Sequence, residues 1–107
     1  MKDRLRFYHV RRNNGAVMTV AAEVDPTGRF VSMGFAYCSN KDQFNKRVGR
    51  TKAIGRLDSS NSYTTEFTGH SSNDLARIFD HVSKPNSWKK CKLINIEETG
   101  LTFVEKV

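Results

Sequence analysis

The sequence predicts one α+β domain over residues 1–107, in which a mainly antiparallel sheet is covered by two helices. Three observations indicate this class. Apolar residues alternate with period two along the first forty residues, two later segments have helical spacing, and strand patterns return after each of those segments. The length of 107 residues suits a single domain, and no internal repeat or Pro/Ser-rich linker divides it.

The first forty residues predict an antiparallel meander of three strands. Alternation over 5–10 indicates the first strand, and the Asn-Asn-Gly sequence at 13–15 supplies the positive-φ residues of a tight hairpin turn. A second strand is expected over 17–24. The Asp-Pro-Thr-Gly sequence at 25–28 predicts the next turn, because Pro fixes φ and Gly frees it. The third strand is expected over 31–38.

The two faces of this third strand differ in the size of their side chains. Small residues on one face leave room for another element to pack closely, most simply a helix. The bulky face carries Val31, Met33, Phe35 and Tyr37, and the small face carries Ser32, Gly34, Ala36 and Cys38.

The sequence predicts a first helix after this meander. Ser39 is expected as the N-cap with Asp42 three residues later, and the helix is expected to end near Ile54, with Gly55 as its left-handed C-terminal residue. Gly49 weakens the helix interior and indicates a close approach to a neighbour. The residues expected to form its buried stripe are Phe44, Val48 and Thr51.

The remaining chain completes the predicted order β-β-β-α-β-α-β-β. A short strand is expected over 63–67, and a second helix begins at Ser71 or Ser72 and stops at Pro85. A hairpin of two strands, over 90–97 and 101–105, ends the chain. The apolar stripe of the second helix consists of Leu75, Ile78, Phe79 and Val82.

Positive charge is concentrated in three clusters. The net charge is +7 and the sequence pI is about 9.7. Residues 1–12 carry five basic and one acidic side chain, residues 41–57 carry six and one, and residues 84–92 carry four Lys and no acid. If folding brings these clusters to one face, they attract a polyanion; if they scatter, they only keep the protein soluble.

The segment 41–57 is the densest cluster, and its only acid is Asp42. Salt bridges within the helix therefore cannot neutralise it, and we expect contacts to phosphates or to an acidic partner; a solvated helix face is the alternative. The expected contact residues are Lys41, Lys46, Arg47, Arg50, Lys52 and Arg56. Residues expected to extend this basic face are Arg4, Arg6, Arg11, Arg12, Lys89, Lys90 and Lys92.

Trp88 stands beside the lysines of the third cluster. An aromatic ring next to cations can stack a base and hold its phosphate. The alternative is an edge strand whose lysines block unwanted pairing with other strands.

Residues 33–38, Met-Gly-Phe-Ala-Tyr-Cys, resemble the core of the first ribonucleoprotein motif of RNA-recognition domains, which would make Phe35 and Tyr37 base-stacking platforms. The sequence departs from that motif at Met33, where Lys or Arg is usual, and at Asn40, where an aromatic is usual. No helix pattern precedes Met33 either. We therefore expect Phe35 and Tyr37 in the core.

A second resemblance covers 23 residues, 35–57. The run Phe-Ala-Tyr-Cys-Ser-Asn-Lys-Asp-Gln-Phe-Asn-Lys at 35–46, followed by Gly49-Arg50 and Gly55-Arg56-Leu57, resembles short phage and mobile-element proteins of unknown function. The resemblance implies a virus-encoded protein that binds nucleic acid or disables a host factor, and it implies no activity.

The sequence predicts neither an enzyme nor a metal or cofactor site. The three histidines (His9, His70 and His81) have no ligand spacing and are expected at the surface or in capping positions. Cys38 and Cys91 lie 53 positions apart and are expected to be half-buried strand thiols. Neither a signal peptide nor an apolar run of bilayer length is present, so we expect the cytoplasm of the cell that makes it, which is the host if it is phage-encoded.

Two functions remain open from the sequence. The first is a small nucleic-acid-binding protein, for DNA or RNA, with weak or no sequence specificity. The second is a protein inhibitor or modulator that docks its basic face on an acidic surface of a host protein complex. A homodimer that pairs through the strand at 90–96 is a weaker third possibility.

Overall fold

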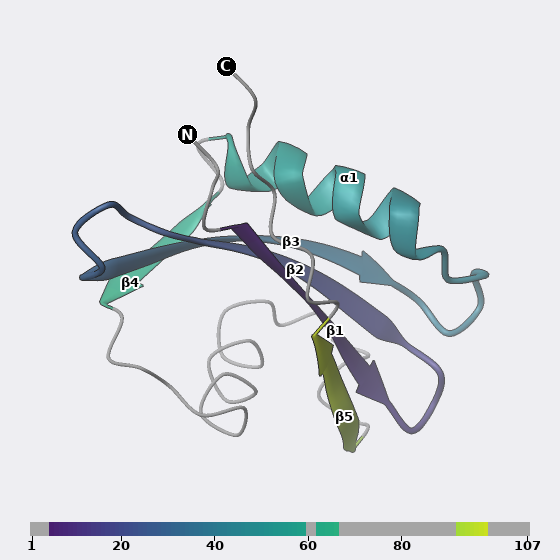
Figure 1. The fold of residues 1–107 in the computed structure, drawn as a ribbon. Coiled ribbons are helices and arrows are strands. Elements are labelled where there is room, and N and C mark those ends of the chain that lie inside the picture. Colours follow the sequence, from purple (N-terminus) through teal and green to yellow (C-terminus); the bar gives the residue numbers. More distant parts are fainter. Residues whose placement is uncertain (1–4, 60–61, 67–91, 99–107) are drawn as a thin grey trace.

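The computed structural model describes residues 5–59, 62–66 and 92–98. Over these residues the chain forms a five-stranded antiparallel sheet with one helix across one face (Figure 1). The strand order is β4-β3-β2-β1-β5. The elements are β1 (Leu5–Arg12), β2 (Val17–Val24), β3 (Phe30–Cys38), α1 (Lys46–Leu57), β4 (Tyr63–Glu66) and β5 (Leu93–Glu98).

The predicted meander is confirmed, and its two turns form as the sequence indicates. Gly15 has a φ of 90°, and its N–H donates to the carbonyl of Arg12 across the first turn (3.1 Å). Gly28 has a φ of 74° in the second turn. There the Asp25 carboxylate accepts hydrogen bonds from the Thr27 hydroxyl (2.6 Å) and the Arg29 N–H (2.9 Å). These bonds lower the pKa of Asp25.

Two shorter strands extend the meander at its edges. β4 pairs with the first half of β3, with Phe30 opposite Glu66 and Met33 opposite Tyr63. β5 pairs with β1 on the other edge, with Val10 opposite Ile96. The prediction of an antiparallel α+β sheet is therefore confirmed, whereas the expected second helix and last strand lie outside the described residues. No helix in the described part of the chain combines the length and apolar character needed to cross a bilayer.

Apolar side chains fill both faces of the sheet. On the face away from α1, Val10, Met18 and Met33 are fully buried, and Phe35 and Tyr37 pack partly buried against them. The expectation that Phe35 and Tyr37 belong to the core is confirmed. On the other face, Leu5, Phe7 and Ala21 form a second cluster with the helix residues Ala53 and Leu57.

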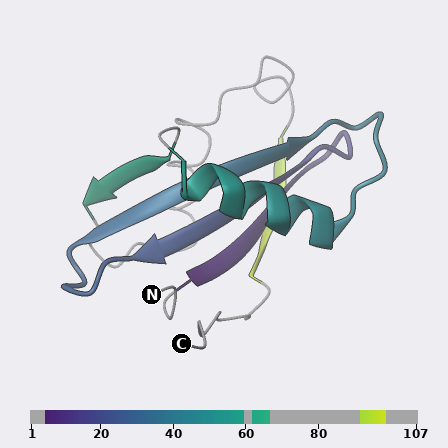
Figure 2. The same cartoon turned by 90° about the horizontal axis from the view of Figure 1, so that it is seen from above.

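Helix α1 lies directly on the small-residue face of β3, as the sequence predicts (Figure 2). A Cβ atom at Gly34 would overlap the backbone of Ala53 and Leu57, so the missing side chain is what admits the helix. Gly49 of the helix makes a second close approach, because a Cβ there would lie 2.5 Å from the Thr19 hydroxyl oxygen. The two glycines thus hold α1 close to β2 and β3.

The predicted start and end of this helix are wrong. Ser39 donates its hydroxyl to Asp42 (3.0 Å), and the Asp42 N–H donates to the Ser39 carbonyl (3.2 Å), so these residues close a turn of their own. The N-cap is Asn45, whose side-chain oxygen accepts from the N–H of Val48 (3.2 Å). The helix then continues through Gly55 to its C-cap at Asp58.

The predicted buried stripe is also wrong. Val48 is 49% exposed, and Thr51 is exposed too. The helix instead turns Gly49, Ala53 and Leu57 to the sheet, at intervals of four residues. The small residues Gly49 and Ala53 let the helix backbone approach the strands closely, and Leu57 adds an apolar side chain to the core.

Candidate functional site at the start of helix α1

Three cations extend from α1 and the loop before it without a carboxylate partner. Within residues 5–59, 62–66 and 92–98, no ion pair forms at Lys41, Arg47 or Lys52, and all three are exposed. The first turn of α1 contains no acidic residue, although a helix N-terminus carries partial positive charge and favours acids. Lys41, Arg47 and Lys52 are therefore uncompensated cations among the described residues.

Lys46 does have a partner, which corrects the expectation that this cluster lacks internal counter-ions. Its ammonium forms an ion pair with the carboxylate of Glu97 in β5. Arg11 of β1 binds the other oxygen of the same carboxylate at 2.9 Å. The hydrogen bonds from Lys46 and Arg11 lower the pKa of Glu97 to about 2. This contact joins three elements that lie far apart in the sequence.

Two more cations of the cluster contact the protein itself. Arg50 is half-buried, and its guanidinium carbon lies 6.0 Å from the ring centre of Phe7. Arg56 donates to the carbonyl of Phe35 (2.6 Å), at a point where β4 no longer pairs with β3. Both side chains lie beside the surface formed by Lys41, Arg47 and Lys52, and each contacts a residue of the sheet.

The residues expected to extend the basic face have different positions. Arg12 is only 5% exposed, so its predicted role as a contact residue is wrong: it sits at the bulge where the β1–β5 register shifts. Arg6 lies 4.0 Å from Glu98, and Lys92 is exposed immediately before β5. Trp88, Lys89, Lys90 and Arg4 lie outside the described residues.

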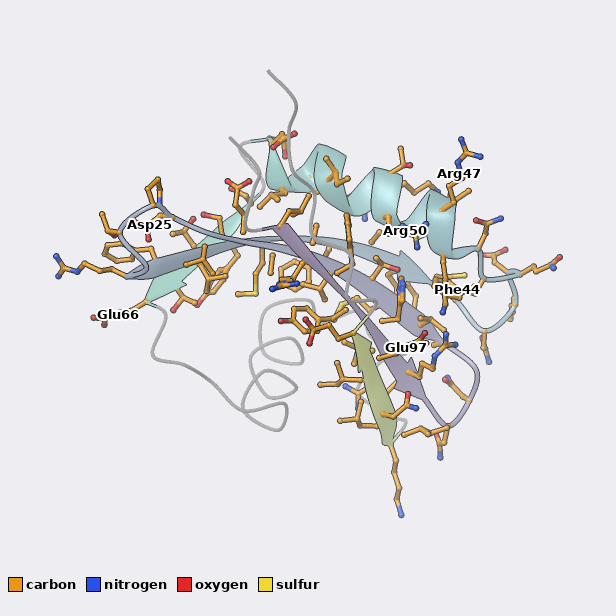
Figure 3. The ribbon with its side chains drawn as sticks, viewed as in Figure 1. Asp25, Phe44, Arg47, Arg50, Glu66 and Glu97 are labelled. Atoms are coloured by element: carbon orange, nitrogen blue, oxygen red, sulfur yellow. The ribbon has the colours of Figure 1, made fainter. Side chains whose placement is uncertain are left out.

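The labelled residues of this site lie together in the molecule. Arg47, Arg50, Phe44 and Glu97 lie toward one end, and Asp25 and Glu66 lie at the other (Figure 3).

Below the helix start, Phe44 and His9 form a small aromatic cluster. Their ring centres are 5.3 Å apart in an edge-on arrangement, and the Arg11 guanidinium lies 5.4 Å from the Phe44 ring centre. His9 is fully buried and its Nδ1 is 3.0 Å from the Thr19 hydroxyl, so the expectation of a surface or capping histidine is wrong for His9. Burial lowers the pKa of His9 to about 4, which leaves the ring neutral at pH 7.

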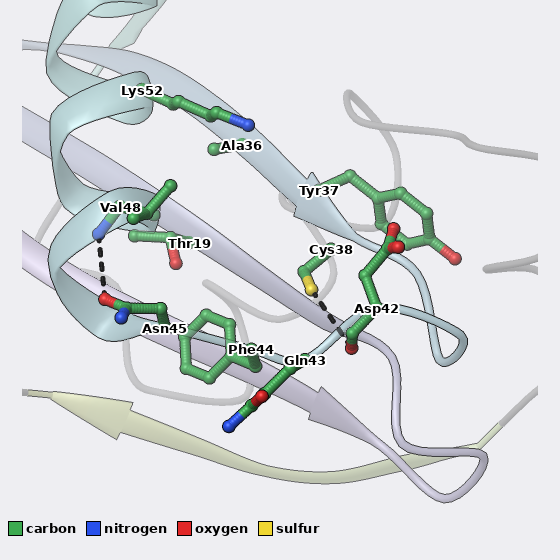
Figure 4. A pocket seen from close by; sticks show the side chains of 11 residues that line it. Thr19, Ala36, Tyr37, Cys38, Asp42, Gln43, Phe44, Asn45, Val48 and Lys52 are labelled. Atoms are coloured by element: carbon green, nitrogen blue, oxygen red, sulfur yellow. Dashed lines mark hydrogen bonds between the residues drawn. The ribbon is translucent and has the colours of Figure 1, made fainter.

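A pocket of about 400 Å³ opens between the end of β3, the loop at 39–45 and the first turns of α1 (Figure 4). Its apolar walls come from Ala36, Phe44 and Val48. Its polar lining residues are Thr19, Cys38, Asp42, Gln43, Asn45 and Lys52. The pocket therefore adjoins the uncompensated cations of the helix.

One thiol lines this pocket. The Cys38 thiol donates to the carbonyl of Asp42 (3.7 Å), and burial raises its pKa, so it is a poor nucleophile at pH 7. The Cys38 expectation of a half-buried strand thiol is confirmed, and Cys91 lies outside the described residues. No group of three or more His, Cys, Asp or Glu side chains in the described part could hold a metal ion.

Sequence reasoning missed Phe44, Asn45 and Glu97 as parts of this site. Asn is a preferred N-cap residue, so Asn45 could have been recognised, but the Ser39–Asp42 pair competed with it. Nothing local to Glu97 indicates its contact with Arg11, which lies 86 residues away in the sequence.

Comparisons with protein-family models, with curated proteins and with solved structures found no match to this chain.

Proposed function

We propose that the protein binds nucleic acid through its phosphates, with little dependence on base sequence. The observation that carries this proposal is the set of outward cations around the N-terminal half of α1, with no acid in the first helical turn. The proposed contact residues are Lys41, Arg47 and Lys52, with Arg50 and Arg56 at the borders of the surface.

The helix dipole makes these cations unfavourable for the isolated helix, because the helix N-terminus already carries partial positive charge. A cation in the first turn of a helix opposes the dipole and costs roughly 0.3–1 kcal/mol at an exposed position. Lys46 and Arg47 both stand there, and Glu97 pairs only with Lys46. An arrangement that is unfavourable for the helix alone becomes favourable when phosphates lie against it, because both the cations and the helix N-terminus attract anions.

Charge reversal at Arg47 tests this proposal. Labelled single-stranded DNA, duplex DNA and RNA would be titrated with the protein and with the R47E variant by fluorescence anisotropy. The R29E variant is the matched control, because it has the same net charge and lies in the β2–β3 turn, away from α1. We expect R47E to weaken binding roughly tenfold or more and R29E to have a much smaller effect.

Equal losses in R47E and R29E would mean that only net charge matters and would contradict the proposed surface. Absence of binding to all three nucleic acids would reject nucleic acid as the partner.

One observation favours the alternative of an acidic protein surface. Val48 is 49% exposed beside the cations, and an apolar side chain can anchor a protein interface. Under this alternative, a stoichiometric protein partner is retained from a host lysate after nuclease treatment and is lost with R47E. Under the main proposal, nuclease treatment of the lysate removes the nucleic acid, and no protein partner is retained.

A further inference from the structure

The pocket beside the proposed phosphate surface has the size of a small-ligand site. Its volume of about 400 Å³ falls in the lower part of the range of such sites, and it is large enough for a single nucleobase. It is built on elements that the fold fixes, because its floor is β3 at Ala36 and one wall is the first part of α1. Gly49 brings that part of α1 close to Thr19.

The lining divides into an apolar part and a polar part. Phe44, Ala36 and Val48 offer apolar surface, as the faces of a base require. Gln43 and Asn45 offer amide groups, which can donate to and accept from the edge of a base. The Asn45 oxygen already accepts from the helix, so its NH₂ group is the part that can meet a ligand.

The two charges of the pocket favour a nucleotide over a simple anion. Asp42 lines the pocket and repels an anion placed inside it, but its carboxylate can accept a hydrogen bond from the exocyclic amino group of a base. Lys52 lines the pocket too and stands apart from Gln43 and Phe44 in Figure 4. An ammonium in this place can hold the phosphate of a nucleotide whose base lies against Phe44.

We propose that this pocket receives one unpaired nucleobase of a single-stranded nucleic acid whose phosphates lie on the cations of α1. The inference rests on the proposed function and adds its substrate class, because a base within a duplex is stacked and paired and cannot enter a pocket.

The experiment compares two short, fluorescently labelled single-stranded DNAs with the same number of phosphates. One has all its bases, and in the other abasic tetrahydrofuran units replace most of them. Dissociation constants would be measured for the protein, for V48L, which adds aliphatic bulk at an exposed position of the pocket wall without changing charge or adding an aromatic ring, and for R47Q, which removes one cation outside the pocket. Circular dichroism would confirm that each variant is folded.

We expect the intact strand to bind roughly tenfold more tightly than the abasic strand, since stacking of one base on an aromatic side chain contributes about 1–3 kcal/mol. V48L should weaken binding of the intact strand and leave that of the abasic strand unchanged. R47Q should weaken both by the same factor.

The result separates this inference from the proposed function. Equal affinity for the two strands, or a V48L variant that keeps the full preference for the intact strand, would overturn the base pocket and leave phosphate binding in place. Failure of both strands to bind would overturn the proposed function and the base pocket with it.

Discussion

Glu97 is the residue on which the charge balance at the helix start depends. Its carboxylate forms ion pairs with Lys46 of α1 and with Arg11 of β1. In the described part of the chain, no other carboxylate pairs with a cation of α1. The Glu97 side chain is 36% exposed, so each ion pair is partly screened by water and contributes modestly to stability.

Replacing Glu97 with Gln should lower the free energy of unfolding by about 0.5–1 kcal/mol at pH 7. Because the folded-state pKa of Glu97 is about 2, against an ordinary 4.5, its contribution is present above pH 4.5 and is lost as pH falls toward 2. Chemical denaturation of the protein and of E97Q across this range should therefore give two curves that converge in acid.

The matched control is E66Q, which removes an exposed carboxylate in β4 that has no ion pair among the described residues. A difference between E97Q and the unchanged protein that stays constant down to pH 2 would contradict the assigned role of Glu97.

His9 shows how burial changes a titratable group. Its ring is enclosed between Thr19 and Phe44, and its Nε2 has no hydrogen-bond partner in the described part of the chain. Burial is the main cause of its lowered pKa; the positive charges of Arg11 and Arg50 act in the same direction, and Glu97 acts against them.

A titration of the His9 ring by NMR should give a pKa near 4, below the ordinary 6.5. The unfolded chain takes up this proton at higher pH than the folded protein does, so His9 makes stability fall as pH decreases from about 6.5 to about 4. A pKa near 6.5 in the folded protein would show that the ring is not enclosed as described.

At the scale of elements, the contact of α1 with the sheet depends on Gly34. G34A places a methyl group into the helix backbone, which cannot move as a side chain can, so we expect a loss of about 2–3 kcal/mol in the free energy of unfolding. G55A is the matched control on the exposed side of α1. Its Cβ would meet nothing within 4 Å, so it should raise stability by roughly 0.5–1 kcal/mol.

Chemical denaturation measures the free energy of unfolding of both variants. Equal effects of G34A and G55A would contradict the close approach of α1 to β3.

The sequence predicted the close approach of α1 to β3, because this contact depends on a local pattern of small residues. The alternation of small residues at Gly34 and Ala36 is visible in the chain, and so are the turns around Gly15 and Gly28. The helix start was not predictable in the same way, since Ser39 and Asp42 have the residue types of a cap but hydrogen-bond to each other in a separate turn.

The pairing of strands that are distant in the sequence could not be predicted from local patterns either. β5 lies beside β1, and that placement puts Glu97 between Arg11 and Lys46. The candidate site was therefore predicted as a basic segment, whereas its internal counter-ion and its pocket came only from the tertiary structure.

At the scale of the whole molecule, the cations around α1 that have no carboxylate partner in the described part of the chain are the ones available to an external polyanion. Lys46 and Arg11 are both paired with the one carboxylate of Glu97, and Arg12 is buried, so the surface available to phosphates is smaller than the composition suggests. Lys41, Arg47 and Lys52 form its centre. The number of counter-ions that binding releases should reflect this smaller set rather than the net charge of +7.

The salt dependence of affinity for single-stranded DNA tests this claim most directly. The account predicts a linear fall of log affinity with log salt, with a slope of roughly 0.7 for each phosphate neutralised, which corresponds to a slope of about 2 for three contacts. R47Q should reduce the slope by roughly 0.7, and R29Q should leave it unchanged. An affinity that does not change with salt, or a slope that R47Q and R29Q reduce equally, would contradict the account.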